Sequence, residues 1–157
     1  MSIIKELICR DESIRTVFVG DGELRNRTEE RVKCEGLGGS IVFAGAVDNV
    51  PEWLSAVDVL LMPSLFEGLP FVLVEAQAAG LPCVVSSSVS DEANISGKIH
   101  YISLEENPAV WADMVIAEVK NGRYNAMNQL VQSGYSIEET ARKVIEAIGS
   151  ASTKDNK

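Results

Sequence analysis

The segment from Val57 to Ser86 constrains the fold of this chain more than any other part of it. It begins with an unbroken apolar run, Val57 to Met62, which is typical of a strand buried on both faces of a sheet. Proline and glycine residues then set apart a loop, a short apolar helix from Phe71 to Ala79 and a second strand from Cys83 to Ser86. This order predicts a parallel strand pair whose connecting loop and helix start lie at the carboxyl ends of the strands.

Two carboxylates in this segment suggest a ligand. Glu67 lies in the loop, and Glu75 lies about one turn inside the helix among apolar residues. A buried carboxylate needs hydrogen-bond donors, which two neighbouring ribose hydroxyls would supply. The free N–H groups of the helix start, around Leu69 to Val72, would suit a phosphate. The alternative is that Glu75 faces solvent and Glu67 has no ligand, because acids are favoured near helix starts in any case.

The family resemblance of the chain rests on four blocks of sequence. They are VFVGDGEL, IVFAGAVDNV, AVDVLLMPS and PSLFEGLPFVLVEAQAAGLPCVVS, and they occur in this order along the chain. Together they resemble the donor-site region of GT-B-type glycosyltransferases of the retaining family 4, over about residues 2–148. The later segments ISLEENPAVWADMV and GYSIEETARK are most similar to capsular and exopolysaccharide members of that family.

The resemblance implies that a sugar moves, with retention, from a nucleoside-diphosphate sugar to a glycan or lipid-linked acceptor in polysaccharide biosynthesis. A UDP-sugar is the first expectation for the donor, and the scheme requires no metal or cofactor. Glu67 is the catalytic candidate: it would contact the donor sugar and stabilise the leaving charge, while Glu75 would hold the ribose hydroxyls. The loop near the nucleobase would bind it largely through its backbone. The remaining expected binding residues are Gly68, Leu69, Pro70, Phe71 and Val72 at the phosphates, and Ala46, Val47 and Asp48 at the base.

The alternation of strands and helices predicts one α/β domain with a Rossmann-like, doubly wound parallel sheet over residues 1–149, followed by a polar tail at 150–157. The expected strands begin at Thr16, Ile41, Val57, Cys83 and Ile99. Matched to the family, and in the strand order 3-2-1-4-5-6, they occupy places 2 to 6. The empty place 1 would leave two open edges, beside the strands at Thr16 and Val57. Because open edges invite pairing with another chain, we expect self-association rather than closure of the gap.

Two parts of a GT-B enzyme are missing from this sequence. One is the acceptor-binding domain, and the other is a basic pair that binds the diphosphate at the start of the donor domain. We therefore expect the chain to act with an N-terminal acceptor-binding domain and to be inactive alone. The alternatives are a non-catalytic nucleotide-sugar-binding module or subunit, and another GT-B enzyme such as a nucleotide-sugar epimerase.

Charge and composition exclude some partners. The net charge of −9 argues against nucleic acid as a partner, because nucleic acid requires basic surfaces. The same charge would also repel an anionic sugar donor. Three scattered cysteines fit a reducing compartment. With neither a secretory signal nor a long apolar stretch in the sequence, we expect a cytoplasmic protein, reaching the inner face of the membrane only through the missing half.

Several other residues have a plain structural interpretation. Asp21, in the turn Gly20-Asp21-Gly22, is expected to cap the helix that follows. Arg25 and Arg27 could bind phosphate, but on this charged helix they are expected to be solvated. His100, the single histidine, does not match the catalytic histidine proposed for the family, which lies in the other domain, and is expected to be structural.

Overall fold

The chain folds into alternating strands and short helices, as the sequence predicts. The computed structural model describes residues 1–136, 138, 141–143 and 145–146. The sequence also predicts a helix from Ile137 to Ile148, and half of these residues lie outside the described ones, as does the whole of the polar tail. In chain order the elements are α1 (Ser2–Arg10), β1 (Thr16–Val19), α2 (Arg25–Cys34), β2 (Ile41–Gly45), α3 (Val50–Ala56), β3 (Leu60–Met62), α4 (Phe71–Ala78), β4 (Cys83–Ser86), the 3-10 turn η1 (Asp91–Ala93), β5 (Ile99–Ile102), α5 (Pro108–Asn121) and α6 (Met127–Gln132).

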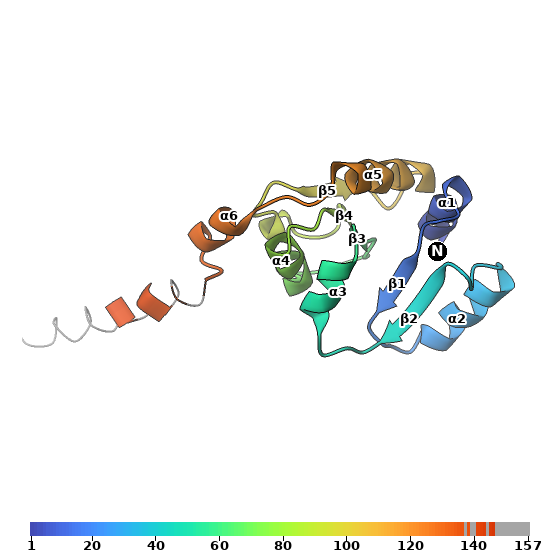
Figure 1. Cartoon of the computed structure of the whole chain (residues 1–157), viewed down its shortest axis with the longest axis horizontal. Coiled ribbons are helices and arrows are strands. Elements are labelled where there is room, and N and C mark those ends of the chain that lie inside the picture. Colours follow the sequence, from blue (N-terminus) through green and yellow to red (C-terminus); the bar gives the residue numbers. More distant parts are fainter. Residues whose placement is uncertain (137, 139–140, 144, 147–157) are drawn as a thin grey trace, which may run out of the picture.

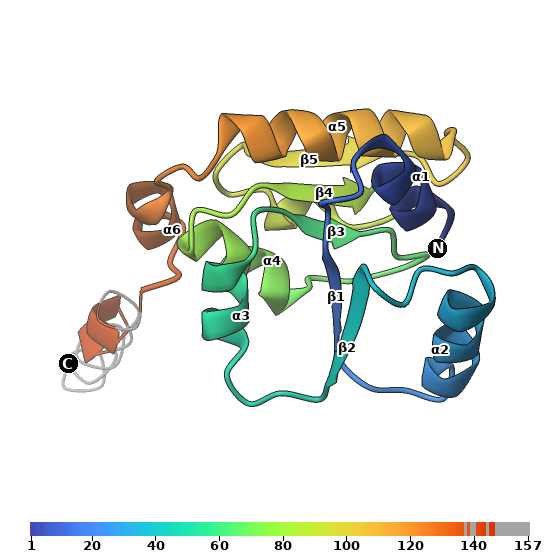
Figure 2. The ribbon, with the colours of Figure 1, turned by 45° about the vertical axis from the view of Figure 1, so that its right-hand side comes forward.

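The strands form two separate parallel sheets. One sheet contains β1 and β2, with Thr16 opposite Ile41, and the other has the order β3-β4-β5, with Cys83 between Leu60 and Ile99. Strand β1 lies on the side of its pair that is nearer to β3 (Figures 1 and 2). The described strands are therefore interrupted where the sequence predicts an empty strand place, between β1 and β3.

Backbone hydrogen bonds show which edges are open. Leu60 N–H donates to the carbonyl of Pro82 on the β4 side at 2.9 Å, and Thr16 N–H donates to the carbonyl of Ser40 on the β2 side at 2.9 Å. Because backbone groups of successive residues point to opposite edges of a strand, those of Leu61 and Val17 face the interruption. Strand β3 is also shorter than the expected run of 57–62, and all three of its residues are only half-buried. An unpaired edge accounts for this exposure.

Helix α1 connects the two sheets through its apolar face. Ile4 and Ile8 pack in a cluster with Ile41 of β2, whereas Leu7 packs in a second cluster with Val84 of β4 and residues of α5. Leu61 of β3 contacts both clusters. Ion pairs support the same position, because Lys5 lies 3.6 Å from Glu35 and Arg10 pairs with Asp113 on α5. Helix α1 therefore spans the interruption on one face of the sheets.

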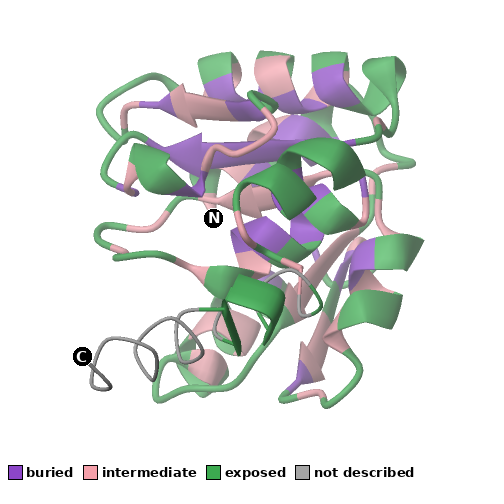
Figure 3. Ribbon diagram, turned by 90° about the vertical axis from the view of Figure 1, so that its left-hand side faces the viewer, coloured by how far each residue is buried: buried purple, intermediate pink, exposed green. Residues whose placement is uncertain are grey.

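The most deeply buried part of the molecule surrounds β4. Residues 80–86 are all buried, and they include the whole of this strand (Figure 3). Leu73 and Ala76 of α4 pack against Cys83 and Val85, and both helix residues are fully shielded from solvent. Packing on this rigid strand fixes α4 and the loops that leave the carboxyl end of the sheet. No described helix has the length and apolar character needed to cross a membrane.

Arg123 and Gly80 join the ends of the helices on the opposite side from the loops. The Arg123 guanidinium donates to the carbonyl of Ala79 at 2.8 Å and to those of Leu54, Ser55 and Val57 at 2.8, 2.9 and 2.6 Å. Gly80 has a φ of +68°, as expected of a left-handed cap, and its carbonyl accepts from Tyr124 N–H at 3.0 Å. A Cβ atom at position 80 would lie 2.0 Å from the carbonyl oxygen of Tyr124. These contacts hold the C-terminal ends of α3 and α4, so that the start of α4 projects toward the carboxyl edge of the sheet.

Candidate functional site

An open hollow of about 730 Å³ lies at the carboxyl ends of β3, β4 and β5. Two loops form it, one after β3 and one after β4, and a parallel bridge between Glu67 and Val89 joins their backbones. The sequence predicts a site at this edge of the sheet, and the hollow contains the expected residues Glu67 and Gly68. Its complete lining is Phe66, Glu67, Gly68, Ser87, Ser88, Val89, Ser90, Asp91 and Tyr101.

The serine-rich wall of the hollow is held by hydrogen bonds to the sheet. Ser87 N–H donates to the carbonyl of Ile102 at 2.9 Å, and Ser88 N–H donates to the Ser86 hydroxyl at 3.1 Å. Ser90 caps the short turn η1, because its hydroxyl accepts from Glu92 N–H at 3.3 Å. The side chains of Ser87 and Ser88 remain exposed. The backbone of this wall is therefore fixed while two of its hydroxyls stay available to a ligand.

Tyr101 forms a further part of the wall, which sequence reasoning did not identify. Its hydroxyl donates to the carbonyl of Ser90 at 3.3 Å. Partial burial raises the pKa of Tyr101, and the nearby negative charge of Asp91 raises it further. Asp91 and Tyr101 both line the hollow. An aromatic residue next to the last position of a strand was the available signal, since that position meets the carboxyl edge.

The start of α4 has no capping side chain. Pro70 occupies the N-cap position, and Leu73 N–H donates to its carbonyl at 3.0 Å. Among the described residues, no backbone partner is present for the N–H groups of Phe71 and Val72. Uncapped N–H groups at a helix start attract anions, which agrees with the expected phosphate position.

Glu75 is exposed, and this corrects the argument that a buried carboxylate needs ribose as a partner. On the same helix Gln77 is fully buried. Its amide donates to the carbonyls of Leu73 and Ala93 and accepts from Ser96 N–H and its hydroxyl. Gln77 is thus the polar residue whose burial is compensated, whereas Glu75 remains open to solvent.

The other expected binding residues do not line the hollow. Val47 and Asp48 lie in the loop between β2 and α3, where Asp48 is exposed and Val47 is half-buried. Leu69 and Phe71 are exposed by 36% and 69%. The structure therefore brings Glu67 and Gly68 together with the serine wall, and the other expected residues do not line the hollow. These are Ala46, Val47, Asp48, Leu69, Pro70, Phe71, Val72 and Glu75.

No basic side chain of the described residues lines the hollow. Residues 34–97 include no Lys, Arg or His, yet they include eight Asp and Glu residues. Arg25 is engaged by acids, with Glu29 at 2.8 Å and Asp21 at 3.4 Å, and these contacts raise its pKa. Asp21 also accepts from Gly22 N–H and does not cap α2, contrary to the expectation. Among the described residues, no group of three or more His, Cys, Asp or Glu side chains could hold a metal ion.

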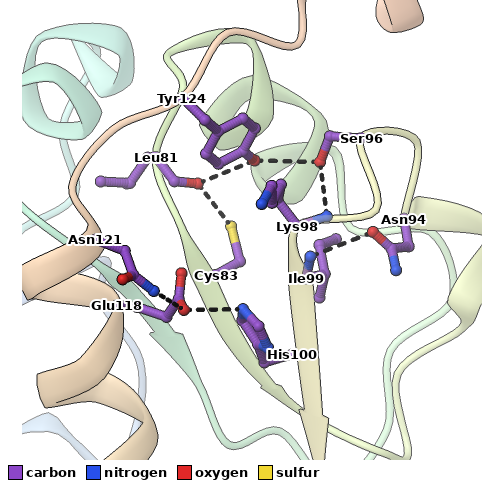
Figure 4. A network of polar contacts seen from close by, with 10 residues as sticks. All are labelled: Leu81, Cys83, Asn94, Ser96, Lys98, Ile99, His100, Glu118, Asn121 and Tyr124. Carbon is purple, nitrogen blue, oxygen red and sulfur yellow. Dashed lines mark hydrogen bonds and ion pairs between the residues drawn. The ribbon is translucent and has the colours of Figure 1, made fainter.

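His100 belongs to a separate polar network near the amino ends of β4 and β5 (Figure 4). Its Nε2 atom lies 3.3 Å from Oε1 of the buried Glu118, which also accepts from the amide of Asn121 at 2.9 Å. The hydroxyl of Tyr124 lies nearby, 3.2 Å from the Ser96 hydroxyl. The hollow lies at the carboxyl ends of these strands. His100 therefore occupies a structural position, as the sequence predicts.

Parallel strands, a hollow at their carboxyl edge and an adjoining uncapped helix start define an α/β domain whose loops and helix start meet at one edge of the sheet, the edge where such folds bind ligands. The family profile described as "Glycosyl transferases group 1" matches residues 1–121, so the chain belongs to this family. EpsF of Bacillus subtilis, which is assigned as a glycosyltransferase, is 34% identical over 144 residues, covering 89% of this chain and 38% of EpsF. An Escherichia coli enzyme named UDP-Gal:alpha-D-GlcNAc-diphosphoundecaprenol alpha-1,3-galactosyltransferase is 35% identical over 92 residues, 58% of this chain and 24% of its own length.

Solved structures show the same fold. A variant of TarM from Staphylococcus aureus, solved with UDP, has a TM-score of 0.75 at 15% identity over 92% of this chain. HepE from Anabaena, solved with UDP-glucose, has a TM-score of 0.70 at 18% identity over 94% of this chain. The chain spans 31% of the TarM chain and 44% of the HepE chain. The fold is thus the Rossmann-like C-terminal domain of a GT-B glycosyltransferase, and the chain spans less than half of the proteins it resembles.

Proposed function

We propose that this chain is the donor-binding domain of a retaining glycosyltransferase that transfers a sugar from a UDP-sugar in polysaccharide biosynthesis. The observation that carries the proposal is the junction of the Glu67 hollow with the uncapped start of α4, in a chain of this family. One relative is named for a UDP-galactose donor, and HepE was solved with UDP-glucose, which favours the same donor class here. The acceptor would be a glycan or a lipid-linked glycan.

Each part of the donor has a proposed position. The sugar lies in the hollow, where the Glu67 carboxylate accepts hydrogen bonds from its hydroxyls and so orients it. Because a carboxylate is itself negative, the charge that develops on the leaving diphosphate is stabilised by the N–H groups at the start of α4 rather than by Glu67. The diphosphate lies against the backbone of Gly68 to Val72, where the N–H groups of Phe71 and Val72 face it. Glu75 accepts from the ribose hydroxyls, which its exposure permits without a burial cost. The loop with Val47 and Asp48 contacts the base.

The charge distribution supports a partner that supplies cations. A diphosphate carries at least two negative charges, and residues 34–97 would surround it with acids alone. The basic pair expected at the start of the donor domain would offset that repulsion, and the N-terminal acceptor-binding domain would complete the site, in the cytoplasm or at the inner face of the membrane. Without this domain the chain binds nucleotide weakly and transfers no sugar. Sugar transfer by the purified chain, with no other protein present, would contradict this view.

The open edges of β1 and β3 support self-association of the chain when it is alone. Their unpaired backbone groups can form hydrogen bonds with the same edges of a second copy. We expect light scattering to show a dimer or larger species whose fraction rises with protein concentration. A single monomeric species at all concentrations would contradict the pairing of these edges.

Nucleotide titration tests the proposed donor site directly. We expect UDP to bind in the high micromolar to millimolar range. Glu75→Ala should weaken binding by about 1.5 kcal/mol, the low end of the range for hydrogen bonds to a charged group, because Glu75 is exposed and water can replace part of the contact. Glu30→Ala, which removes an exposed acid from α2, is the matched control and should leave affinity unchanged. Equal UDP binding by wild type and Glu75→Ala in ligand-observed NMR would refute the ribose assignment.

A further inference from the structure

We propose that the hollow selects an uncharged sugar and excludes uronic acids, which carry a carboxylate in place of the hydroxymethyl group. This inference rests on the proposed function, since it assumes that the hollow holds the donor sugar. It goes further by naming the class of sugar. The groups that carry it are Glu67, Asp91, the hydroxyls of Ser87 and Ser88, and the ring of Tyr101.

The charge of the lining is the first argument. Glu67 and Asp91 are the charged residues that line the hollow, and both are acids. The absence of basic residues from 34–97 means that neither loop offers a cation to a bound carboxylate. Two like charges a few ångströms apart near a protein surface repel strongly, and salt screens this repulsion only in part. A uronic acid would meet this repulsion, whereas a neutral hexose would not.

The hydrogen-bonding groups are the second argument. Carboxylates only accept hydrogen bonds, and sugar hydroxyls can donate to them. The hydroxyls of Ser87 and Ser88 can donate to, or accept from, the same sugar. Phe66, at the rim, and Tyr101 add apolar ring surface for the C–H groups of a pyranose. The lining therefore matches a neutral, hydroxyl-rich ring in both its polar and its apolar groups.

The rigidity of the wall is the third argument. The N–H groups of Ser87, Ser88 and Val89 are each bound to the ends of β4 or β5, at 2.9, 3.1 and 3.0 Å. The Glu67–Val89 bridge links the opposite loop to the same wall. These bonds hold the backbone of both loops, so the two acids leave the wall from fixed backbone positions beside the bound sugar. Discrimination by charge requires such a fixed site.

The test compares UDP-glucose with UDP-glucuronate, which differ only at C6, and uses UDP as the reference. Binding of all three to the full chain is measured by ligand-observed NMR at low ionic strength. We expect UDP-glucose to bind at least about tenfold more tightly than UDP-glucuronate, as one repulsive charge contact in a fixed site predicts. The ratio should shrink in Asp91→Asn and in Glu67→Gln, which replace each charge with a neutral group of similar shape. Glu92→Gln is the control, because Glu92 is an exposed neighbour that does not line the hollow.

Each outcome decides a separate point. Equal affinity of the wild type for the two sugar nucleotides, with UDP binding intact, would overturn the charge selection and leave the proposed function standing. A tenfold preference that neither Asp91→Asn nor Glu67→Gln reduces would overturn the assignment to this hollow. Failure of UDP itself to bind would overturn the proposed function and this inference with it. A preference that shrinks in both variants and persists in Glu92→Gln would support the inference.

Discussion

Replacing Arg123 tests how the C-terminal ends of α3 and α4 are held. One guanidinium nitrogen lies 2.6–2.9 Å from the carbonyl oxygens of Leu54, Ser55 and Val57, and the other donates to Ala79 at 2.8 Å. The carbonyls at the ends of helices have no intrahelical partners and carry partial negative charge. Arg123 thus provides both hydrogen bonds and a positive charge to two helix ends at once.

The expected loss of stability in Arg123→Ala follows from the exposure of this site. A hydrogen bond to a charged group contributes about 1.5–3 kcal/mol when its carbonyl would otherwise be unsatisfied. Arg123 is exposed, so water can reach the freed carbonyls and recover most of that free energy. We therefore expect about 2 kcal/mol in total for the four contacts and the helix-end charge. For a domain of this size that lowers Tm by about 4–8 °C.

Thermal and urea unfolding, followed by circular dichroism, measure this change. Arg123→Lys keeps the charge but loses the planar fork, so its stability should lie between those of Arg123→Ala and wild type. Lys98→Ala removes an exposed positive charge elsewhere and should change the free energy of unfolding by less than about 0.5 kcal/mol. An Arg123→Ala variant as stable as Lys98→Ala would refute the role of the four contacts.

Two further predictions concern the turn at Gly80 and the response to alkaline pH. Gly80→Ala should lower the free energy of unfolding, measured with urea, by more than about 2 kcal/mol. The reason is that it combines a left-handed backbone with a Cβ placed against the Tyr124 carbonyl. Gly39→Ala is the control and should not show this loss, because a Cβ there meets nothing within 4 Å. Burial raises the pKa of Cys83 from 9.0 to about 12 and that of Tyr124 from 10.0 to about 12. The folded state therefore keeps protons that the unfolded state releases, so stability is full below about pH 9 and falls as the pH rises toward 12. Tyr124→Phe should lose less stability than wild type between pH 10 and 12, and identical pH profiles would contradict this.

Much of the fold could be predicted because the residues that end its helices can be recognised in the sequence. Gly36 and Gly80 each follow a helix with a positive φ, as left-handed caps do, and Gly122 also ends α5 with a positive φ. The exceptions come from tertiary contacts. The apolar run beginning at Val57 predicts six strand residues, but the carbonyl of Val57 accepts from Arg123, and only Leu60–Met62 pair with β4. Neither contact is visible in a local pattern.

The candidate site was predictable in position but less so in detail. The loop and helix start at the carboxyl edge follow from the order of elements, and Glu67 lies in the hollow as expected. Helix α4 is apolar on nearly all sides, so its sequence cannot distinguish a buried polar residue from an exposed one. A rotation of 100° per residue places Glu75 and Gln77 on different faces, and the position of β4 decides which face is buried. The position of Tyr101 near the end of β5 is visible in the sequence, but its contact with the loop after β4 depends on how β5 pairs with β4.

The way that α1 joins the two sheets has a consequence for how the protein opens. Backbone hydrogen bonds make each sheet cooperative within itself, but none of those between described strands crosses from β1 to β3. The two halves are coupled mainly by the apolar side chains of α1 and by Leu61. Fraying of this one helix at its first turns would release the β1–β2 unit while the β3–β5 core stays folded. The amides of β1 and β2 would then exchange with solvent through partial opening, whereas those of β4 would exchange only when the whole domain unfolds.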